Sequence, residues 1–376
     1  MKMAIDCRAL RNAPSGIPNF LVASINEFSR CFTNWEFFLL SNEEFHPEIA
    51  KQIIYRANVK VIIEPLLLFK KVSFLWLLTK ANFIVNKIKP DLYWSPAFLL
   101  PPFLRNEIQT LVTVHDIVNK EFKSTMSLIG RIYAHLLQDY SINKADKLWA
   151  NSYYTTHSIK KYYKARNSKD IFTGFFINKT LFKPITVSPE EKAELLNKYK
   201  VNSKFILFVG TLEPRKNLEF LLKLMPSIKH LEVKLLVVGA KGWGNTKISS
   251  IVESKDYPSE NVLFLGFVPT EDLIKLYNLA SVFISTSLNE GFGMPQLEAM
   301  ACGCPVITPH NSAMIEVVEG AGETVRSWYV NDWVNAITKV LSNREGYSLK
   351  GLERSKQYEA ELVLKQLFSY INNEKS

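Results

Sequence analysis

Short apolar runs alternate with longer segments of helical periodicity along this chain of 376 residues. Such alternation is typical of parallel sheets whose strands are connected by helices. In the first half, strands are predicted at Ala4–Cys7, Glu36–Leu40, Val59–Ile63, Leu92–Ser95, Leu111–Val114 and Leu148–Asn151. Helices are predicted at Ile17–Phe28, Leu128–Lys144 and Thr155–Lys164.

A polar, proline-containing stretch at Lys179–Glu190 interrupts the alternation, which then restarts. Further strands are predicted at Phe205–Val209, Lys234–Val238, Val262–Leu265, Val282–Ser285 and Val306–Thr308. Because the chain is longer than one hydrophobic core usually supports, two domains are expected. The sequence therefore predicts an α/β protein with two doubly wound domains, hinged near residue 185, whose ligand lies beyond the carboxyl ends of the strands.

The composition excludes several other classes of protein. With 47% hydrophobic and 22% charged residues, the chain is not expected to be disordered. No apolar run reaches the ~20 residues that span a bilayer, and the first residues do not resemble a secretory signal. The cysteines are predicted to be buried thiols in a reducing cytosol, because Cys302 and Cys304 lack zinc-site spacing and nearby histidines.

The net charge of +10 suggests an anionic partner. No nucleic-acid-binding module accompanies the charge, so we expect no nucleic acid to bind. Basic and aromatic residues interleave at residues 65–90 and 160–169. This pattern fits a segment at an anionic membrane surface, and it fits equally a core helix whose lysines extend into solvent.

The most informative motif, NEGFGMPQLEAMACGCPVI, contains two glutamates with seven residues between them. Gly291 and Gly293 permit positive φ and close approach of a ligand, and Pro295 suits the start of a helix. Glu290 is therefore predicted in the loop before a helix, and Glu298 in its first turn. The free N–H groups at that helix start predict an anion site. Carboxylates on either side of it suit a nucleotide-sugar, which carries a diphosphate between ribose and hexose.

Other candidate residues follow predicted strands. In the sequence FVGTLEPRKN, Gly210 permits a tight turn, and Arg215 and Lys216 follow where a diphosphate can bind; a solvated basic turn is the alternative. His115 follows the strand Leu111–Val114 at the edge where ligands bind.

Glycines predict backbone contacts to a ligand after two further strands. Gly239, Gly242 and Gly244 allow hydrogen bonds to a nucleobase, with Lys241 near its phosphate or base. Phe267, after the next predicted strand, is a further candidate for contact with the nucleobase. Trp243 fits base contact and packing equally.

These motifs resemble glycosyltransferase family 4, the retaining GT-B enzymes with an E-x7-E signature. The resemblance implies two Rossmann-like domains, residues 1–185 and 186–356, that face each other across a cleft. It also implies that a terminal helix at Gln357–Asn373 crosses back, so that residues 357–376 join the first domain. In that family the first glutamate contacts the donor hexose, and the second binds the ribose.

The residues and the resemblance together define a candidate site. The expected catalytic residues are His115, Arg215, Lys216 and Glu290. The donor-binding set shares the last three of these and adds Gly16, Gly210, Thr211, Gly239, Lys241, Phe267, Gly291, Phe292, Gly293, Met294 and Glu298. Acceptor contacts are expected from Arg8, Arg11 and Asp116. Thr211 stands where many members carry arginine, and Pro18 stands where a small residue is usual.

The overall pattern looks like bacterial mannosyltransferases of lipopolysaccharide and capsule assembly. It implies transfer of mannose from GDP-mannose to a glycan or lipid-linked glycan, in the cytoplasm or peripherally on the cytoplasmic face of the inner membrane. No DxD-like motif is present, so no metal and no other cofactor is expected. The competing hypotheses are a sugar-nucleotide epimerase of the same fold and a catalytically silent nucleotide-sugar-binding scaffold.

Overall fold

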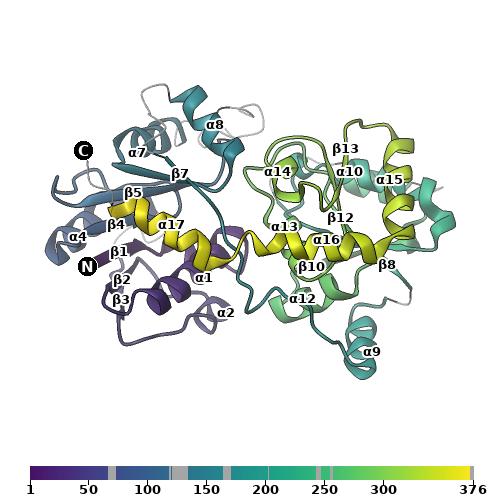
Figure 1. Cartoon of the computed structure of the whole chain (residues 1–376), viewed down its shortest axis with the longest axis horizontal. Coiled ribbons are helices and arrows are strands. Elements are labelled where there is room, and N and C mark those ends of the chain that lie inside the picture. The colour runs from purple at the N-terminus through teal and green to yellow at the C-terminus, as the bar shows by residue number, and fades with distance from the viewer. Residues whose placement is uncertain are drawn as a thin grey trace. The chain divides into compact units, whose positions relative to one another are not determined.

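A computed structural model describes residues 1–66, 73–117, 120, 134–163, 171–201, 203–242, 247–254 and 257–372. The chain divides into unit 1, Met1–Phe176 with Ala360–Ser376, and unit 2, Ile177–Glu359. The polypeptide therefore passes from one unit to the other twice (Figure 1). Residue 185, where the hinge was expected, lies inside unit 2.

Unit 1 contains a seven-stranded sheet in the order β3-β2-β1-β4-β5-β6-β7, and every pair is parallel. The strands are β1 Lys2–Asp6, β2 Glu36–Ser41, β3 Val59–Ile63, β4 Leu92–Ser95, β5 Gln109–Val114, β6 Lys147–Ala150 and β7 Ile171–Thr173. The predicted strands are confirmed to within a few residues at their ends. Only β7 was not predicted, because its three residues, IFT, contain no run of three apolar residues.

Helices connect these strands. They are the 3₁₀ turn η1 Arg8–Arg11, α1 Gly16–Cys31, α2 Pro47–Ala50, α3 Ser73–Trp76, the π-helical turns η2 Leu77–Ala81 and η4 Ala134–Gln138, α4 Asn82–Ile88, α7 Asp139–Lys144, α8 Tyr153–Tyr162 and the terminal α17 Ala360–Asn372. α17 packs on unit 1, where Phe368 stacks on Phe32 with ring centroids 4.0 Å apart. The ring centroid of Tyr370, near the end of α17, lies 5.8 Å from that of Phe172 in β7.

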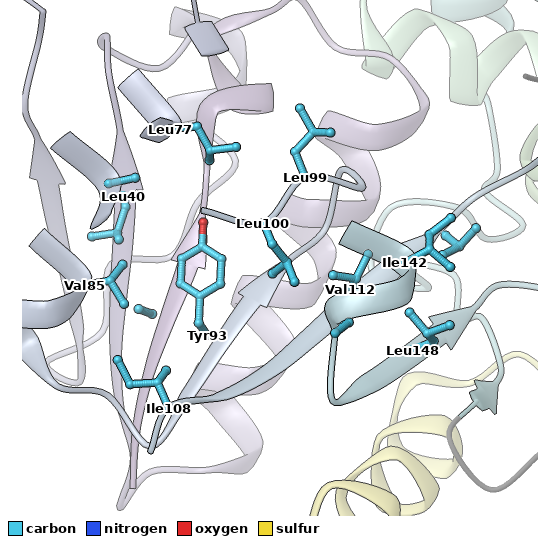
Figure 2. Packing of buried hydrophobic residues seen from close by; sticks show 14 of the residues in the cluster. Leu40, Leu77, Val85, Tyr93, Leu99, Leu100, Ile108, Val112, Ile142 and Leu148 are labelled. Atoms are coloured by element: carbon cyan, nitrogen blue, oxygen red, sulfur yellow. The ribbon is translucent and has the colours of Figure 1, made fainter. Parts of the chain in front are cut away.

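The core of unit 1 fills the space between one face of the sheet and its helices (Figure 2). Tyr93, Val112 and Leu148 project from β4, β5 and β6, and Leu77 and Ile142 meet them from the helical layer. All five are almost completely buried. Their burial follows from the continuous apolar runs that a parallel sheet covered by helices requires.

The described part of residues 65–90 behaves as a core helix. Trp76 is fully buried, and its indole N–H donates to the carbonyl of Glu64 at 2.7 Å. Lys80 and Lys87 extend into solvent, and Phe83 is 67% exposed. Lys70 and Lys71 lie outside the described residues, as do 164–169 of the second basic segment.

Unit 2 contains a six-stranded parallel sheet in the order β10-β9-β8-β11-β12-β13. The strands are β8 Phe205–Val209, β9 Lys234–Val238, β10 Val262–Gly266, β11 Val282–Ile284, β12 Val306–Pro309 and β13 Glu323–Val325. The helices are α9 Pro189–Lys198, η6 Pro214–Lys216, α10 Leu218–Leu224, η7 Met225–Leu231, α11 Ile248–Val252, η8 Ser259–Asn261, α12 Thr270–Leu279, α13 Met294–Ala301, α14 Met314–Val318, α15 Val330–Ser342 and α16 Arg344–Lys356. The three-residue strand β13 was not predicted, for the same reason as β7.

The strand order reverses once in each sheet, between β1 and β4 in unit 1 and between β8 and β11 in unit 2. At such a point the connections leave toward opposite faces, which opens a crevice beyond the carboxyl ends of the strands. The two motifs richest in candidate residues follow β8 and β11. The fold therefore brings them to one end of the unit 2 sheet.

Candidate functional site

The loops after β8 and β11 are joined through their backbones. Leu288 donates its N–H to the carbonyl of Arg215 at 2.8 Å. The hydroxyl of Thr286 donates to the carbonyl of Lys216 at 3.0 Å. Both contacts fix η6 against the loop that leads to Glu290, so that Arg215, Lys216 and Glu290 meet at the reversal point.

Glu290 is the centre of this charged cluster. Lys216 Nζ donates to Glu290 Oε1 at 2.5 Å, and Arg215 Nη1 donates to Oε2 at 2.9 Å. The hydroxyl of Ser287 donates to Oε1 at 2.7 Å. Burial would raise the pKa of Glu290, but the charges of Lys216 and Arg215 outweigh it and bring that pKa to about 2. Glu290 is therefore ionised throughout the neutral range.

Arg215 is held in place by a second carboxylate. Its Nη2 lies 2.7 Å from Glu213 Oε1, and its Nη1 also donates to the carbonyl of Asn289 at 2.7 Å. The side chains of Arg215 and Lys216 are only 15% and 14% exposed. The cations are thus largely removed from water and already oriented, which strengthens their effect on a bound anion.

The helix start after Glu290 has the geometry expected of an anion site. Gly293 caps α13 with φ 115°, a conformation that a residue with a Cβ rarely adopts. Pro295 occupies the first turn, where a missing N–H is harmless. Glu290 anchors the loop through its N–H, which donates to Ser312 Oγ at 3.0 Å. The positive end of α13 therefore faces the same loop as the cations.

Gln296 contributes a buried polar group beneath this turn. Its side chain is 1% exposed and packs against Gly293, where a Cβ would lie 3.2 Å from the amide carbon. Among the described residues, its Nε2 has no hydrogen-bond partner. An unsatisfied buried donor costs stability, and an anion bound at the start of α13 would satisfy this one.

Glu298 lies in a different environment from Glu290. Its Oε2 accepts a hydrogen bond from the hydroxyl of Tyr277 on α12 at 3.0 Å. Burial raises the pKa of Glu298 to about 7, although the Tyr277 hydrogen bond acts in the opposite direction. The two glutamates of the motif therefore have opposite pKa shifts, and only Glu298 changes its charge near neutral pH.

Glu298→Gln is expected to stabilise the folded protein above pH 7. In the folded protein the pKa of Glu298 is raised above its unfolded value, so its contribution to stability is present in acid and is lost as pH rises through about 7. Glutamine is a close mimic of the protonated acid. We therefore expect a gain of about 1–3 kcal/mol near pH 8 and no difference near pH 4.

Urea unfolding at the two pH values measures this difference, with Glu271→Gln on the exposed face of α12 as the matched control. An equal gain at both pH values would show that removing charge at Glu298 is not the cause.

The end of β9 lies between the ends of β8 and β10. Gly239, with φ 147°, donates its N–H to the carbonyl of Gly266 at 2.8 Å. Lys241 and Phe267 are both exposed beyond these strands, Phe267 by 51%. Thr211 is exposed beside them. Trp243 and Gly244 of the same loop lie outside the described residues.

In unit 1, His115 lies beyond the end of β5. It is 8% exposed, and its Nε2 lies 2.7 Å from the carbonyl of Pro96. Burial lowers the pKa of His115, so the ring is neutral near pH 7. Because Nε2 then carries the proton, Nδ1 is an acceptor, and it has no partner among the described residues. Phe20, from the second turn of the helix that Gly16 begins, packs edge-on against His115 at 5.4 Å.

The arginines expected to meet an acceptor have partners within unit 1. Arg8 Nη2 lies 2.6 Å from Asp6 Oδ2, both side chains are buried, and the guanidinium lies over the ring of Trp76. Arg11 pairs with Glu43 at 3.1 Å and keeps part of its surface exposed. Asp116 is half-buried directly after His115.

Several residues that hold the site were not predicted from the sequence. They are Glu213, Tyr277, Ser287, Asn289, Gln296 and Ser312. The polar run at residues 285–287, directly after a buried strand, is the one local signal that could have indicated Ser287. The rest meet the site from other elements, which no local pattern reveals.

The described residues contain no group of three or more His, Cys, Asp or Glu side chains placed to hold a metal ion. None of the helices described is both long and apolar enough to cross a bilayer. The four cysteines are free thiols; Cys7, Cys302 and Cys304 are buried as expected, whereas Cys31 is only partly buried. Burial raises the pKa of Cys304 to about 12.

The two doubly wound units define the class of fold as GT-B. The chain aligns over its full length with Anabaena Alr3699/HepE in complex with UDP-glucose, at a TM-score of 0.76 and 16% identity, with 100% of both chains covered. It aligns similarly with WaaG, a glycosyltransferase involved in lipopolysaccharide biosynthesis, at a TM-score of 0.71, 15% identity and 100% coverage of both chains.

Residues 190–359, which lie within unit 2, match the family model described as glycosyl transferases group 1. The chain is 35% identical over 178 residues to O-antigen chain mannosyltransferase B of Escherichia coli, covering 46% of each chain. It is 27% identical over 239 residues to O-antigen chain mannosyltransferase RfbU of Salmonella typhimurium, covering 64% of this chain and 62% of that one. The chain thus spans about half the length of the first of these relatives.

Proposed function

We propose that the protein is a retaining hexosyltransferase that moves a hexose from a nucleotide-sugar to a growing surface glycan. The observation that carries this proposal is the meeting of Glu290 with Arg215 and Lys216 at the strand-order reversal of unit 2. The family match of residues 190–359 supports transfer over the epimerase alternative.

In this proposal the donor lies along the carboxyl edge of the unit 2 sheet. Lys216, Arg215 and the N-terminus of α13 bind the diphosphate. Glu298, when ionised, accepts hydrogen bonds from the ribose hydroxyls, because a carboxylate is an acceptor only. The loops that hold Gly210, Thr211, Gly239, Lys241 and Phe267 contact the rest of the nucleotide. The turn from Gly291 to Met294 supports the diphosphate from the helix side.

The remaining residues proposed to contact the donor and the acceptor belong to unit 1. Neutral His115 offers Nδ1 as an acceptor for a hydroxyl of the donor hexose, and Gly16 lets the start of α1 approach the diphosphate. Asp116 and Arg11 remain candidates for the acceptor. Arg8 is a weaker candidate, since Asp6 already binds its guanidinium.

The reaction breaks the bond between the anomeric carbon and a diphosphate oxygen. It forms a bond from that carbon to an acceptor hydroxyl oxygen on the same face, and the hydroxyl proton passes to the departing diphosphate. Glu290 is a poor nucleophile and base for this step, because its pKa is about 2 and three donors occupy it. The preoriented cations stabilise the charge on the leaving group.

The donor we favour is GDP-mannose, because the relatives named above are mannosyltransferases. UDP-glucose is the second candidate, since it occupies a solved structure of the same fold. A lipid-linked glycan on the cytoplasmic face of the inner membrane is the acceptor we favour, with unit 1 near an anionic bilayer.

A thermal-shift screen with GDP, GDP-mannose, UDP, UDP-glucose, ADP and dTDP tests the donor assignment. A ligand at about 100 times its Kd adds about 2.7 kcal/mol to stability when it binds only the folded state. We expect GDP or UDP compounds to raise the melting temperature by several degrees. If no nucleotide shifts the melting curve, the proposed donor site is wrong.

A further inference from the structure

A separate cavity lies beside the charged cluster of unit 2. Its volume is about 230 Å³, and it is lined by Asn217, Glu219, Phe220, Lys223, Leu288 and Trp328. Asn217 directly follows Lys216, and Leu288 is the residue whose N–H binds the carbonyl of Arg215. The cavity therefore shares two loops with the candidate donor site but uses different side chains.

The aromatic wall of this cavity packs on other rings and is partly exposed. The Trp328 ring is parallel to that of buried Trp333, with centroids 5.6 Å apart, and Phe220 meets it edge-on at 5.0 Å. Nevertheless 39% of Trp328 is exposed, and the adjacent Tyr329 is 77% exposed. A fixed indole that keeps this much surface in water indicates a binding surface.

The polar wall offers hydrogen-bonding groups of several kinds. The Asn217 side chain supplies an amide for which no bond is found among the described residues. Glu219 already accepts the N–H of Lys247 at 2.7 Å through Oε1. Lys223 supplies an exposed ammonium group.

These two walls match the two kinds of surface on a sugar ring. The C–H face of the ring is electropositive and suits the negative face of an indole, while its hydroxyls donate and accept at the rim. The volume is below the roughly 300–1,000 Å³ of sites for drug-sized ligands, which suits a single ring. The negative charge of the Glu219 carboxylate disfavours binding of a phosphate or another anion in this cavity.

We propose that this cavity binds one sugar residue of the glycan acceptor, away from the residue that receives the hexose. The inference rests on the proposed function. The donor is assigned to the loops after β8, β9 and β10 and to the start of α13, whereas Trp328 follows β13. A second anchoring point of this kind raises the affinity for acceptors long enough to reach it.

Binding of free oligosaccharides tests the proposal without requiring catalysis. Saturation-transfer NMR and titration with α-mannotriose, and with maltotriose as a second probe, are applied to the full chain. We expect wild type to bind at least one trisaccharide in the millimolar range, and Trp328→Ala to weaken that binding about 5- to 10-fold. Phe264→Ala, which removes another exposed aromatic ring from unit 2, is the matched control and should bind as wild type does.

A second variant guards against misfolding of Trp328→Ala. Asn217 has φ 49°, so Asn217→Gly keeps its left-handed backbone while removing the amide. It should also weaken trisaccharide binding several-fold. Absence of binding by wild type to either probe, or equal binding by wild type and both variants, overturns the proposal. If nucleotides do not raise the melting temperature of wild type, the donor site is overturned instead. Failure of the sugar-binding proposal and failure of the proposed function are therefore distinguishable.

Discussion

Lys216→Ala is expected to lower the rate of hexose transfer by about 100- to 1,000-fold, because removing one preoriented donor from developing negative charge costs about 2.7–4 kcal/mol. Lys216 is largely buried, and its ammonium lies 2.5 Å from Glu290 Oε1. No mobile lysine on the surface can therefore take over the role of the lost ammonium group. Initial rates at saturating donor measure the effect.

The fold is expected to survive this change, because Arg215 and Ser287 still donate to Glu290. Lys229→Ala, at an exposed position on η7, is the matched control and should retain wild-type activity. A Lys216→Ala rate within threefold of wild type would remove Lys216 from the reaction. If the variant also loses the nucleotide-induced melting shift, the defect lies in donor binding as well as in chemistry.

Gly239→Ala is expected to destabilise unit 2 by more than about 3 kcal/mol. Losses this large come from a few causes, and steric clashes with buried atoms and backbone strain are two of them. A Cβ on Gly239 would lie 2.0 Å from the carbonyl oxygen of Gly210 and 2.7 Å from its carbonyl carbon. Both atoms are backbone, so no side-chain rotation relieves the contact. The positive φ of 147° adds strain of its own.

Gly266→Ala is the control for this substitution. Gly266 also has a positive φ, of 66°, but no atom lies within 4 Å of its would-be Cβ. Gly266→Ala should lower the free energy of unfolding by only roughly 1–2 kcal/mol, the cost of placing a residue with a Cβ in the left-handed conformation. Urea unfolding of both variants measures the difference, and equal losses would show that the contact with Gly210 is not decisive.

The Gly239 contact also changes the interpretation of that residue. From the sequence it was predicted to let the backbone reach a nucleobase. In the structure, the absence of a side chain at Gly239 lets the ends of β8 and β9 lie side by side. A contact with the nucleotide remains a proposal.

Most strands were predictable because they contain a run of at least three apolar residues. The short strands β7 and β13 each have three residues and give no such run. The segment at residues 65–90 was ambiguous because a core helix and a membrane-surface helix share one amphipathic pattern. In the part described, Trp76 is buried in the core of unit 1, which only tertiary structure could show, and contact with a membrane stays a prediction.

The candidate site was predictable in its residues more than in its contacts. Strand-end position and the resemblance to a known family indicated Glu290 and Lys216. Their direct ion pair joins residues 74 positions apart, which spacing cannot reveal. The opposite pKa shifts of the two glutamates likewise depend on tertiary structure, because the charges of Lys216 and Arg215 lower the pKa of Glu290 whereas burial raises that of Glu298.

The most direct test of the central claim is transfer of labelled hexose from GDP-mannose or UDP-glucose into glycolipids of membranes from the organism that carries this chain. Wild type and Glu290→Gln are compared under identical conditions. We predict label in the glycolipid fraction with wild type, and at least about 100-fold less with the variant, because glutamine is neutral where Glu290 binds two cations. Equal incorporation by both proteins, or none with wild type from either donor, would contradict the account.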